Sequence, residues 1–396
     1  MTPAVRRRID QDDEEQRATT LELFYDLVFV FAITQVSHTL LEHLTWAGAG
    51  QAAIVLLAVH WSWNFTTWVT NELDPDVIHV RILLLVLMLL SLLLAIAIPE
   101  AFGGRALLFA VSYVAIQVLR HGFLTFVAAD AGTNERERAG RILTWFVFAG
   151  IFWIGGALVG EGSTRTVLWV AALVIDYGGA LLTFWVPGRP KLDGTSWEVT
   201  APHMAERFQA FVIIALGESI VVTGATAAGH ELDVPTATAL VLAFLGTAAF
   251  WWLYFTSVGR IAEDTLLHAR DQTMLTRDVY TFLHVVLIAG IVVSAVGDEV
   301  VLAHPKEELG TPELVALVAG PVLYFFAQLL IKFRVMGEIG WTRVAAIVAC
   351  IAAGAVGTTT AALVPAALLA LVGCVLIAAD EHQMRSHFAS EPALEG

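Results

Sequence analysis

The sequence predicts an all-α polytopic membrane protein, and three observations support this fold class. The chain has 396 residues, of which 57% are hydrophobic and only 15% are charged, and a soluble protein of this size needs more polar surface. Apolar runs of about 18 to 25 residues, long enough to cross roughly 30 Å of hydrocarbon, recur from end to end. No stretch between these runs is long enough to form a separate soluble domain.

Twelve spanning helices are expected, in two groups of six. The spans cover about residues 21–43, 47–70, 77–98, 105–128, 140–160, 165–186, 203–228, 235–258, 274–297, 311–333, 340–360 and 363–384. We therefore expect two six-helix repeats, at residues 21–186 and 203–384, joined by a cytoplasmic linker at 187–202. Cytoplasmic tails are expected at both ends, at residues 1–20 and 385–396.

The first span begins with the stretch ELFYDLVFVFAITQVSH (22–38), which has acids where a signal peptide has basic residues. No small-x-small cleavage site follows it, so we interpret it as a retained membrane helix and not as a cleaved signal. The preceding tail, 1–20, is highly charged and lacks aromatic residues, which is typical of disordered segments.

The distribution of basic residues predicts the orientation in the membrane. With twelve spans, 19 of the 22 Lys and Arg residues fall on the side of the N-terminus, and Arg105, Arg165 and Lys306 fall on the other. Because cytoplasmic loops carry the excess of Lys and Arg, both termini are expected to be cytoplasmic. We expect the protein in the inner (plasma) membrane of a cell.

The sequence lacks the motifs of several common nucleotide-binding and catalytic sites. It contains no Walker A motif, Gly-rich dinucleotide loop, His-Glu-x-x-His or Gly-x-Ser-x-Gly, and Cys350 and Cys374 lie in apolar segments. We expect no cofactor, no metal and no nucleic-acid partner. The expected partners are the lipid bilayer and a small solute or ion, with a homo-oligomer left open.

The two groups of spans resemble each other. The stretch ELFYDLVFVFAITQ from Glu22 aligns with ERFQAFVIIALGES from Glu206. Later matches keep the same order and pair FTT (65–67) with FTS (255–257), Tyr113 with Tyr324, Gln117 with Gln328, and Arg141 with Arg343. Because each group has an even number of spans, these stretches indicate a parallel repeat about an axis along the membrane normal, with a crevice between the halves near the midplane.

Five segments carry a resemblance to a known family: 22–38, 206–221, AIPEAF (97–102), LVIDYGG (173–179) and FLHVVLIAGIVVSAVGDE (282–299). Together they resemble the bacterial low temperature requirement A (LtrA) family, from about residue 19 to the last helix. The resemblance implies an integral membrane protein connected with growth in the cold. It implies no catalytic or transport mechanism that can be assigned residue by residue.

A second resemblance concerns Phe24-Tyr25-Asp26. The stretch from Phe24 to Ala-Ile-Thr is similar to the first helix of lysosomal and bacterial potassium channels with a Phe-Ser-Asp motif, which also use six-helix repeats. This chain has Tyr in place of that Ser, and its second repeat has Phe208-Gln209-Ala210 without the acid. The resemblance adds a cation channel to the candidate functions.

Two acids lie deep in predicted spans, where an ionisable side chain costs at least a few kcal/mol. Glu218 lies beside Gly217, where we expect another helix to approach closely, and is a candidate solute, proton or cation site or a structural hydrogen bond. Asp176, followed by two glycines that can distort the helix, is a candidate proton relay or cation site, or a clamp against Arg or His.

Other polar residues lie at the start of spans or among aromatic residues. Glu22 fits a capping box with Thr19, and Glu206 mirrors it after Pro202. Asp26 lies one turn deeper than Glu22, on the same helix face, and we expect it to pair with Arg81. The embedded histidines His60 and His284 are packing residues, or proton carriers if a carboxylate is near.

Three classes of function fit these patterns. The favoured one is a secondary transporter or channel for an ion or small solute that uses buried carboxylates between two pseudo-symmetric halves. The alternatives are an intramembrane enzyme that uses acids, histidines and a metal, and a stress-related membrane scaffold without turnover. In a scaffold, the buried acids would pair fully with protein groups.

Overall fold

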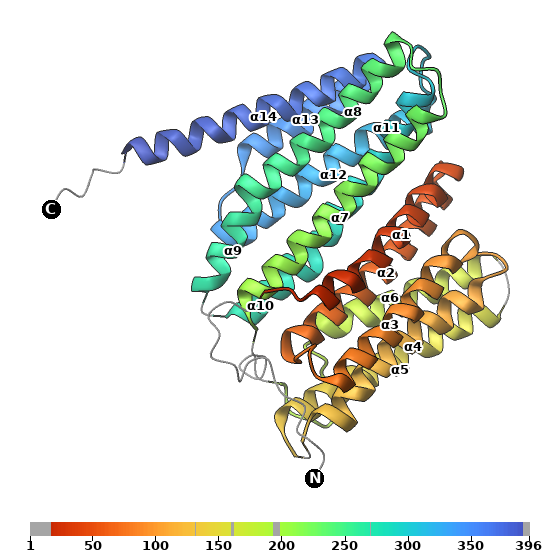
Figure 1. The fold of residues 1–396 in the computed structure, drawn as a ribbon, viewed down its shortest axis with the longest axis vertical. Coiled ribbons are helices and arrows are strands. Elements are labelled where there is room, and N and C mark those ends of the chain that lie inside the picture. Colours follow the sequence, from red (N-terminus) through yellow and green to blue (C-terminus); the bar gives the residue numbers. More distant parts are fainter. Residues whose placement is uncertain (1–16, 131, 160–161, 193–198, 270, 391–396) are drawn as a thin grey trace. The chain divides into compact units, whose positions relative to one another are not determined.

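A computed structural model describes residues 17–130, 132–159, 162–192, 199–269 and 271–390, and the named elements within them are helices (Figure 1). The disordered tail predicted for residues 1–20 lies almost entirely outside the described residues. The described chain divides into two compact units. Unit 1 holds the residues up to Ile214 and Leu267–Arg277, and unit 2 holds Ala215–Leu266 and the residues from Asp278.

Unit 1 is a bundle of six helices that also includes the first half of a seventh. The helices are α1 (Thr20–Glu42), α2 (Trp46–Glu72), α3 (Ile78–Ala97), α4 (Ala106–Phe123), α5 (Asn134–Leu158), α6 (Ser163–Leu181) and α7 (Ala201–Ala228), with the short helical segments η2 (Ile98–Glu100), η3 (Leu124–Ala128) and α10 (Gln272–Thr276).

Unit 2 contains the second half of α7 and the remaining helices. These are α8 (Val234–Leu253), η5 (Tyr254–Val258), α9 (Gly259–His268), η6 (Arg277–Leu283), α11 (His284–Ala303), α12 (Thr311–Met336), α13 (Trp341–Gly357) and α14 (Leu363–Ser390). The last helix continues beyond residue 384, where we expected the twelfth span to end.

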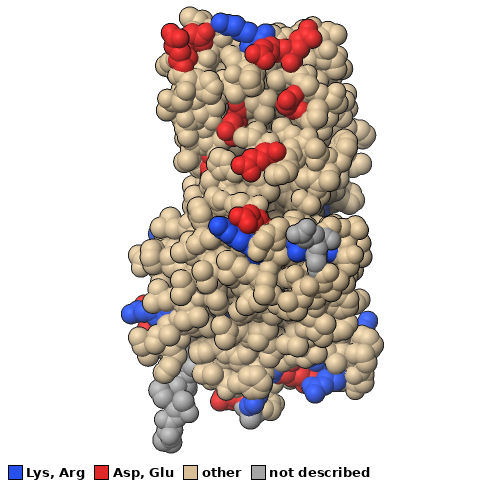
Figure 2. All heavy atoms as spheres, turned by 90° about the vertical axis from the view of Figure 1, so that its right-hand side faces the viewer, with Lys and Arg blue, Asp and Glu red and all other residues tan. Residues whose placement is uncertain are grey.

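Nine helices of the described chain are long and apolar enough to cross a membrane, which supports a polytopic membrane protein. Of the twelve expected spans, those corresponding to α2, α6 and α13 are not among the nine. Helix α2 is too polar to be among the nine. Every residue from Ala58 to Asn71 is buried, so the polar side chains of this stretch contact protein in place of lipid. On the face shown in Figure 2 most side chains are uncharged, and acidic and basic side chains form separate patches among them.

Short polar side chains begin several of these helices. Thr19, Thr45 and Thr133 each accept a hydrogen bond from a backbone N–H in the first turn of α1, α2 and α5. Asp233 does the same for α8. These caps bind backbone N–H groups of the first turn, which have no acceptor within the helix. Such donors are costly to leave without a hydrogen bond near a membrane.

Glycines bring α11 and α12 into close contact in unit 2. A Cβ at Gly290 would lie 2.5 Å from the Tyr324 backbone nitrogen, and one at Gly297 would lie 2.6 Å from Leu317 Cα. The sequence led us to expect such an approach at Gly217, but a Cβ there would meet no atom within 4 Å. The expected distortion by the glycines after Asp176 is also absent, since α6 runs unbroken to Leu181.

Candidate functional site

The N-terminal end of α1 forms the capping box predicted from the sequence. The Glu22 backbone N–H donates to Thr19 Oγ1, and the Thr19 backbone N–H donates to Glu22 Oε2 at 2.8 Å. The cap occupies one carboxylate oxygen of Glu22. The other oxygen is turned toward α7, so the residue has a second role.

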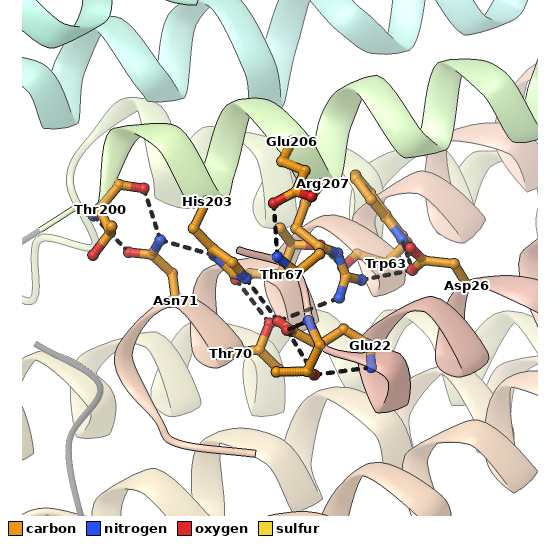
Figure 3. A network of polar contacts seen from close by, with 12 residues as sticks. Glu22, Asp26, Trp63, Thr67, Thr70, Asn71, Thr200, His203, Glu206 and Arg207 are labelled. Atoms are coloured by element: carbon orange, nitrogen blue, oxygen red, sulfur yellow. Dashed lines mark hydrogen bonds and ion pairs between the residues drawn. The ribbon is translucent and has the colours of Figure 1, made fainter. Parts of the chain in front are cut away.

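Glu22, His203 and Arg207 form a fully buried ionic contact between α1 and α7 (Figure 3). Glu22 Oε1 lies 2.8 Å from His203 Nε2 and 3.3 Å from an Arg207 guanidinium nitrogen. The three side chains have 0% exposure. His203 and Arg207 are four residues apart and therefore share one face of α7.

Asp26 completes this cluster from the next turn of α1. Its Oδ1 accepts from Arg207 at 2.6 Å and from the Trp63 indole N–H at 2.8 Å. The predicted pairing of Asp26 with Arg81 is wrong, because Arg81 pairs at the surface with Asp76. Among the described residues, Asp26 Oδ2 has no hydrogen-bond partner although it is buried.

Asn71 fixes the protonation of His203. The Thr200 backbone N–H donates to Asn71 Oδ1, and Asn71 Nδ2 donates to the Thr200 carbonyl, each at 3.0 Å. The same amide nitrogen lies 3.1 Å from His203 Nδ1. Since an amide nitrogen only donates, Nδ1 accepts, and the proton of a neutral imidazole lies on Nε2 and points to Glu22.

The ionic contacts described above join two carboxyl groups to one guanidinium and one imidazole. With both carboxyl groups ionised and the imidazole neutral, the side chains of Glu22, Asp26, His203 and Arg207 together would carry one excess negative charge. Because an uncompensated charge is costly in a buried site, uptake of one proton would make the cluster neutral. The arrangement can therefore hold and release a proton.

Aromatic rings separate this network from its surroundings. Trp63 stacks on Phe211 with 4.0 Å between ring centroids, and the Arg207 guanidinium lies 5.9 Å from the Trp63 ring. His60 packs against Trp63, Phe208 and Phe211 at 6.0 to 6.4 Å. The structure thus places His60 beside the network, within an aromatic wall.

Glu206 lies at the edge of the same network. Its Oε2 accepts from the Ala18 backbone N–H at 2.7 Å, and its side chain is partly exposed. The expectation that Glu206 repeats the capping role of Glu22 is wrong, because α7 begins at Ala201 and has no acid in its first turn.

Asp176 occupies a second buried polar region of unit 1. Its Oδ2 accepts from Tyr113 Oη at 2.7 Å and from Trp153 Nε1 at 3.1 Å, and it is fully buried. In the described structure its Oδ1 has no hydrogen-bond partner. The clamp that holds Asp176 is therefore made of neutral donors and not of the Arg or His that we expected.

The buried guanidinium of Arg120 lies in the same region and likewise contacts neutral groups. It donates to the Ser62 carbonyl and Thr66 Oγ1, each at 3.0 Å, and to Gln117 Oε1. Thr66 Oγ1 also lies 3.0 Å from Tyr25 Oη. Since Tyr25 precedes Asp26, hydrogen-bonding side chains extend from Arg120 to the turn that carries the first network.

The remaining candidates lie in unit 2. The His284 Nδ1–H donates to the Val279 carbonyl at 2.9 Å, so its Nε2 accepts from Tyr254 Oη at 2.8 Å, as expected of a packing histidine. Glu218 is buried in α7, with 1% of its surface exposed. The structure brings together Glu22 and Asp26, with Glu206 and His60 beside them.

The sequence interpretation missed His203, Arg207, Asn71 and Arg120 as site residues. Arg120 and Arg207 were counted as cytoplasmic charges, yet both have 0% exposure. The signal was present in HMAER, where His203 and Arg207 are four apart directly before an apolar run. The predicted orientation stays a prediction, since some of the basic residues that support it are buried in networks.

Comparison with known proteins identifies the family. Residues 17–378 match the family described as bacterial low temperature requirement A protein. The chain belongs to the LtrA family. A relative described as uncharacterized protein RA0937, from Rhizobium meliloti (strain 1021), is 35% identical over 323 residues, which cover 81% of this chain and 78% of the relative. No solved structure matches the chain.

Proposed function

We propose that this LtrA protein is a secondary transporter for an ion or a small solute, and that the buried network in unit 1 carries a proton during its cycle. The observation that carries the proposal is the charge of that network. In the part of the chain that the structure describes, Glu22 and Asp26 share the guanidinium of Arg207, and the hydrogen bond from Asn71 to Nδ1 suits a neutral His203. An ionisable group inside a membrane protein marks a pathway for ions or protons.

The internal repeat that the sequence predicts would suit the same proposal. Tyr113 and Gln117 on α4 and Tyr324 and Gln328 on α12, which we align as repeats, are buried in their own units. In each unit the Gln oxygen accepts from a buried arginine, Arg120 in one and Arg343 in the other. Transporters built from repeats move one half against the other around a central site.

Proton movement into liposomes tests the proposal. The purified protein is reconstituted with a pH-sensitive dye inside, and gradients of Na⁺, K⁺ or Cl⁻ are applied one at a time. We expect one gradient to move protons in the wild type and roughly a tenfold or greater loss in Glu22→Gln and Asp26→Asn. Glu338→Gln, which changes an exposed acid, should behave as the wild type.

The scaffold alternative has one observation in its favour. The network joins α1, α2 and α7 through Glu22, Asn71 and His203, which suits a structural clamp. A clamp would need its charges for folding and not for flux. Glu22→Gln and Asp26→Asn variants that stay folded and keep the flux of the wild type would favour the scaffold over the transporter.

A further inference from the structure

Unit 2 contains a small cavity between α8, α11, α12 and α14. It offers ≈ 40 Å³ to the centres of water-sized molecules, and one water needs roughly 10 to 15 Å³ by this measure. About three waters therefore fit, or one small cation with part of its water shell. An organic solute does not fit.

One carboxylate lines this cavity. Asp298 on α11 lies inside the apolar segment that ends at Ala303. Within the described chain its carboxyl group makes no hydrogen bond or ion pair, whereas the neighbouring Glu299 accepts from Thr226 Oγ1 at 3.2 Å. The other described residues around the cavity carry no charge. The Asp298 carboxyl group thus has no cationic side chain beside it in the described lining of the cavity.

A hydroxyl from the same helix face also lines the cavity. Ser294 precedes Asp298 by four residues, so both lie on one face of α11. Its side chain is 7% exposed, and in the described structure its Oγ has no hydrogen-bond partner. It lies against the α12 backbone, where a Cβ at Gly320 would be 2.3 Å from the hydroxyl.

Helix α12 has a backbone carbonyl without its usual donor at a residue that lines the cavity, and this oxygen is available as a third ligand. Pro321 lies inside α12 and has no N–H, so the Leu317 carbonyl lacks its usual helical donor. Leu317 and Pro321 both line the cavity. Gly297 lets the Leu317 backbone approach α11 at the residue just before Asp298.

We propose that these groups form a binding site for one monovalent cation, Na⁺ or K⁺. Carboxylate, hydroxyl and carbonyl oxygens are the ligands that hard cations prefer, and freed carbonyls in broken membrane helices hold coupling ions in transporters. One carboxylate balances one positive charge. The meaning of this site for transport rests on the proposed function. The site adds to that function by naming monovalent cations as the coupled or transported ions.

Thermal unfolding of the full-length protein in detergent tests the site without transport. NaCl, KCl and choline chloride are compared at equal ionic strength, because a ligand that binds the folded state raises the melting temperature with its concentration. We expect Na⁺ or K⁺ to stabilise the wild type above choline. Asp298→Asn should lose this effect, and Ser294→Ala should raise the half-maximal cation concentration roughly tenfold.

Controls separate this inference from the proposed function. Glu338→Gln should keep the cation effect, and so should Glu22→Gln and Asp26→Asn, which are changed in the other unit. Equal melting of the wild type in all three salts would overturn the site. An unchanged cation effect in Asp298→Asn, or in Ser294→Ala if the first variant does not fold, would do the same. A wild type with the cation effect but without proton flux would keep the site and remove the transporter.

Discussion

At the scale of single residues, the account depends on the pairing of Asp26 with Arg207. Both side chains are buried, with 2% and 0% exposure, and their atoms lie 2.6 Å apart. Removal of one partner from such a pair leaves a charge without compensation, which costs about 3 to 5 kcal/mol. Removal of both charges costs less, because Asp26 is then not left ionised without Arg207 and only Glu22 loses its guanidinium partner.

The first prediction compares Arg207→Met with the double variant Asp26→Asn, Arg207→Met. The single variant should lower the melting temperature strongly, and the double variant should recover a large part of the loss. Intrinsic fluorescence during heating in detergent measures both. Equal destabilisation by the single and double variants would contradict a paired charge.

Arg81→Gln is the matched control for this prediction. The Arg81–Asp76 pair has the same kind of ions at 2.9 Å, but its side chains are 46% and 82% exposed. Exposed pairs contribute about 0 to 1 kcal/mol. A melting temperature close to that of the wild type is expected, since solvent replaces the lost partner.

The sequence predicted the acids of the site better than their partners. Glu22 and Asp26 stand out because they interrupt an apolar run, and the capping box of Glu22 is a local pattern. Arg207 is 181 residues from Asp26, so no local pattern connects them. Arg81 was favoured because it begins a neighbouring span, but it has a nearer partner five residues away in Asp76.

At the scale of elements, glycines decide how closely α11 and α12 pack. A Cβ at Gly290 would approach backbone atoms of Tyr324, which cannot turn away as a side chain can. Close packing through small residues is the main source of helix association in membranes. The α11–α12 contact therefore tolerates no added methyl group at this position.

The second prediction follows for Gly290→Ala. The variant should be destabilised by about 1 to 3 kcal/mol, the usual cost of overpacking, with a lower melting temperature. Gly217→Ala is the control, because its Cβ meets no atom within 4 Å and alanine favours a helix. If Gly290→Ala melted with or above Gly217→Ala, the close approach would be refuted.

The third prediction concerns Asp233, which caps the N-terminal end of α8. Hydrogen bonds from Thr236 and then from Lys306 hold the pKa of Asp233 at about 2, below its ordinary 3.8. Because the pKa of Asp233 is lower in the folded state, its ionised carboxylate stabilises the folded protein above pH 3.8. This contribution disappears as the pH falls toward 2. Asp233→Ala should therefore melt below the wild type at pH 5, and the difference should shrink in acid.

A comparison of melting temperatures between pH 5 and pH 2.5 checks this prediction. A difference that stays constant over the whole range would show that the ionised cap contributes nothing. Thr238→Ala serves as a control within the same helix, because its hydroxyl is exposed and donates to the Val234 carbonyl without an ionisable partner.

Most elements were predictable because apolar length is a local property. The sequence indicated every long helix, including α2, yet it did not show that α2 is buried from Ala58 to Asn71. The polar pattern of that helix reflects contacts with distant segments, such as the one between Asn71 and Thr200. Burial by distant segments is tertiary information that hydropathy alone does not contain.

At the scale of the whole molecule, the predicted topology places both termini in the cytoplasm. The fourth prediction uses fusions of a fluorescent protein or alkaline phosphatase. Fusions at the C-terminus should fluoresce and lack phosphatase activity, whereas phosphatase fused after Lys306, on the predicted outer side, should be active. The opposite pattern would mean that the span number or the direction is wrong.

The two units also differ in the partners of their buried arginines. In unit 2, Arg343 binds both carboxylate oxygens of Asp380 and contacts Gln328, so its charge is balanced. In unit 1, Arg120 contacts Gln117 and other neutral groups. The two units thus use the aligned glutamines with different ionic partners.

The central claim is that the network of Glu22, Asp26, His203 and Arg207 gains and loses a proton inside the membrane protein. Infrared difference spectroscopy of the reconstituted protein, recorded as the pH is lowered, measures it most directly. The account predicts a carbonyl band of a buried carboxylic acid that grows in the wild type and in Glu338→Gln and is lost in Asp26→Asn or Glu22→Gln. A spectrum without that band, or the same band in all four proteins, would contradict it.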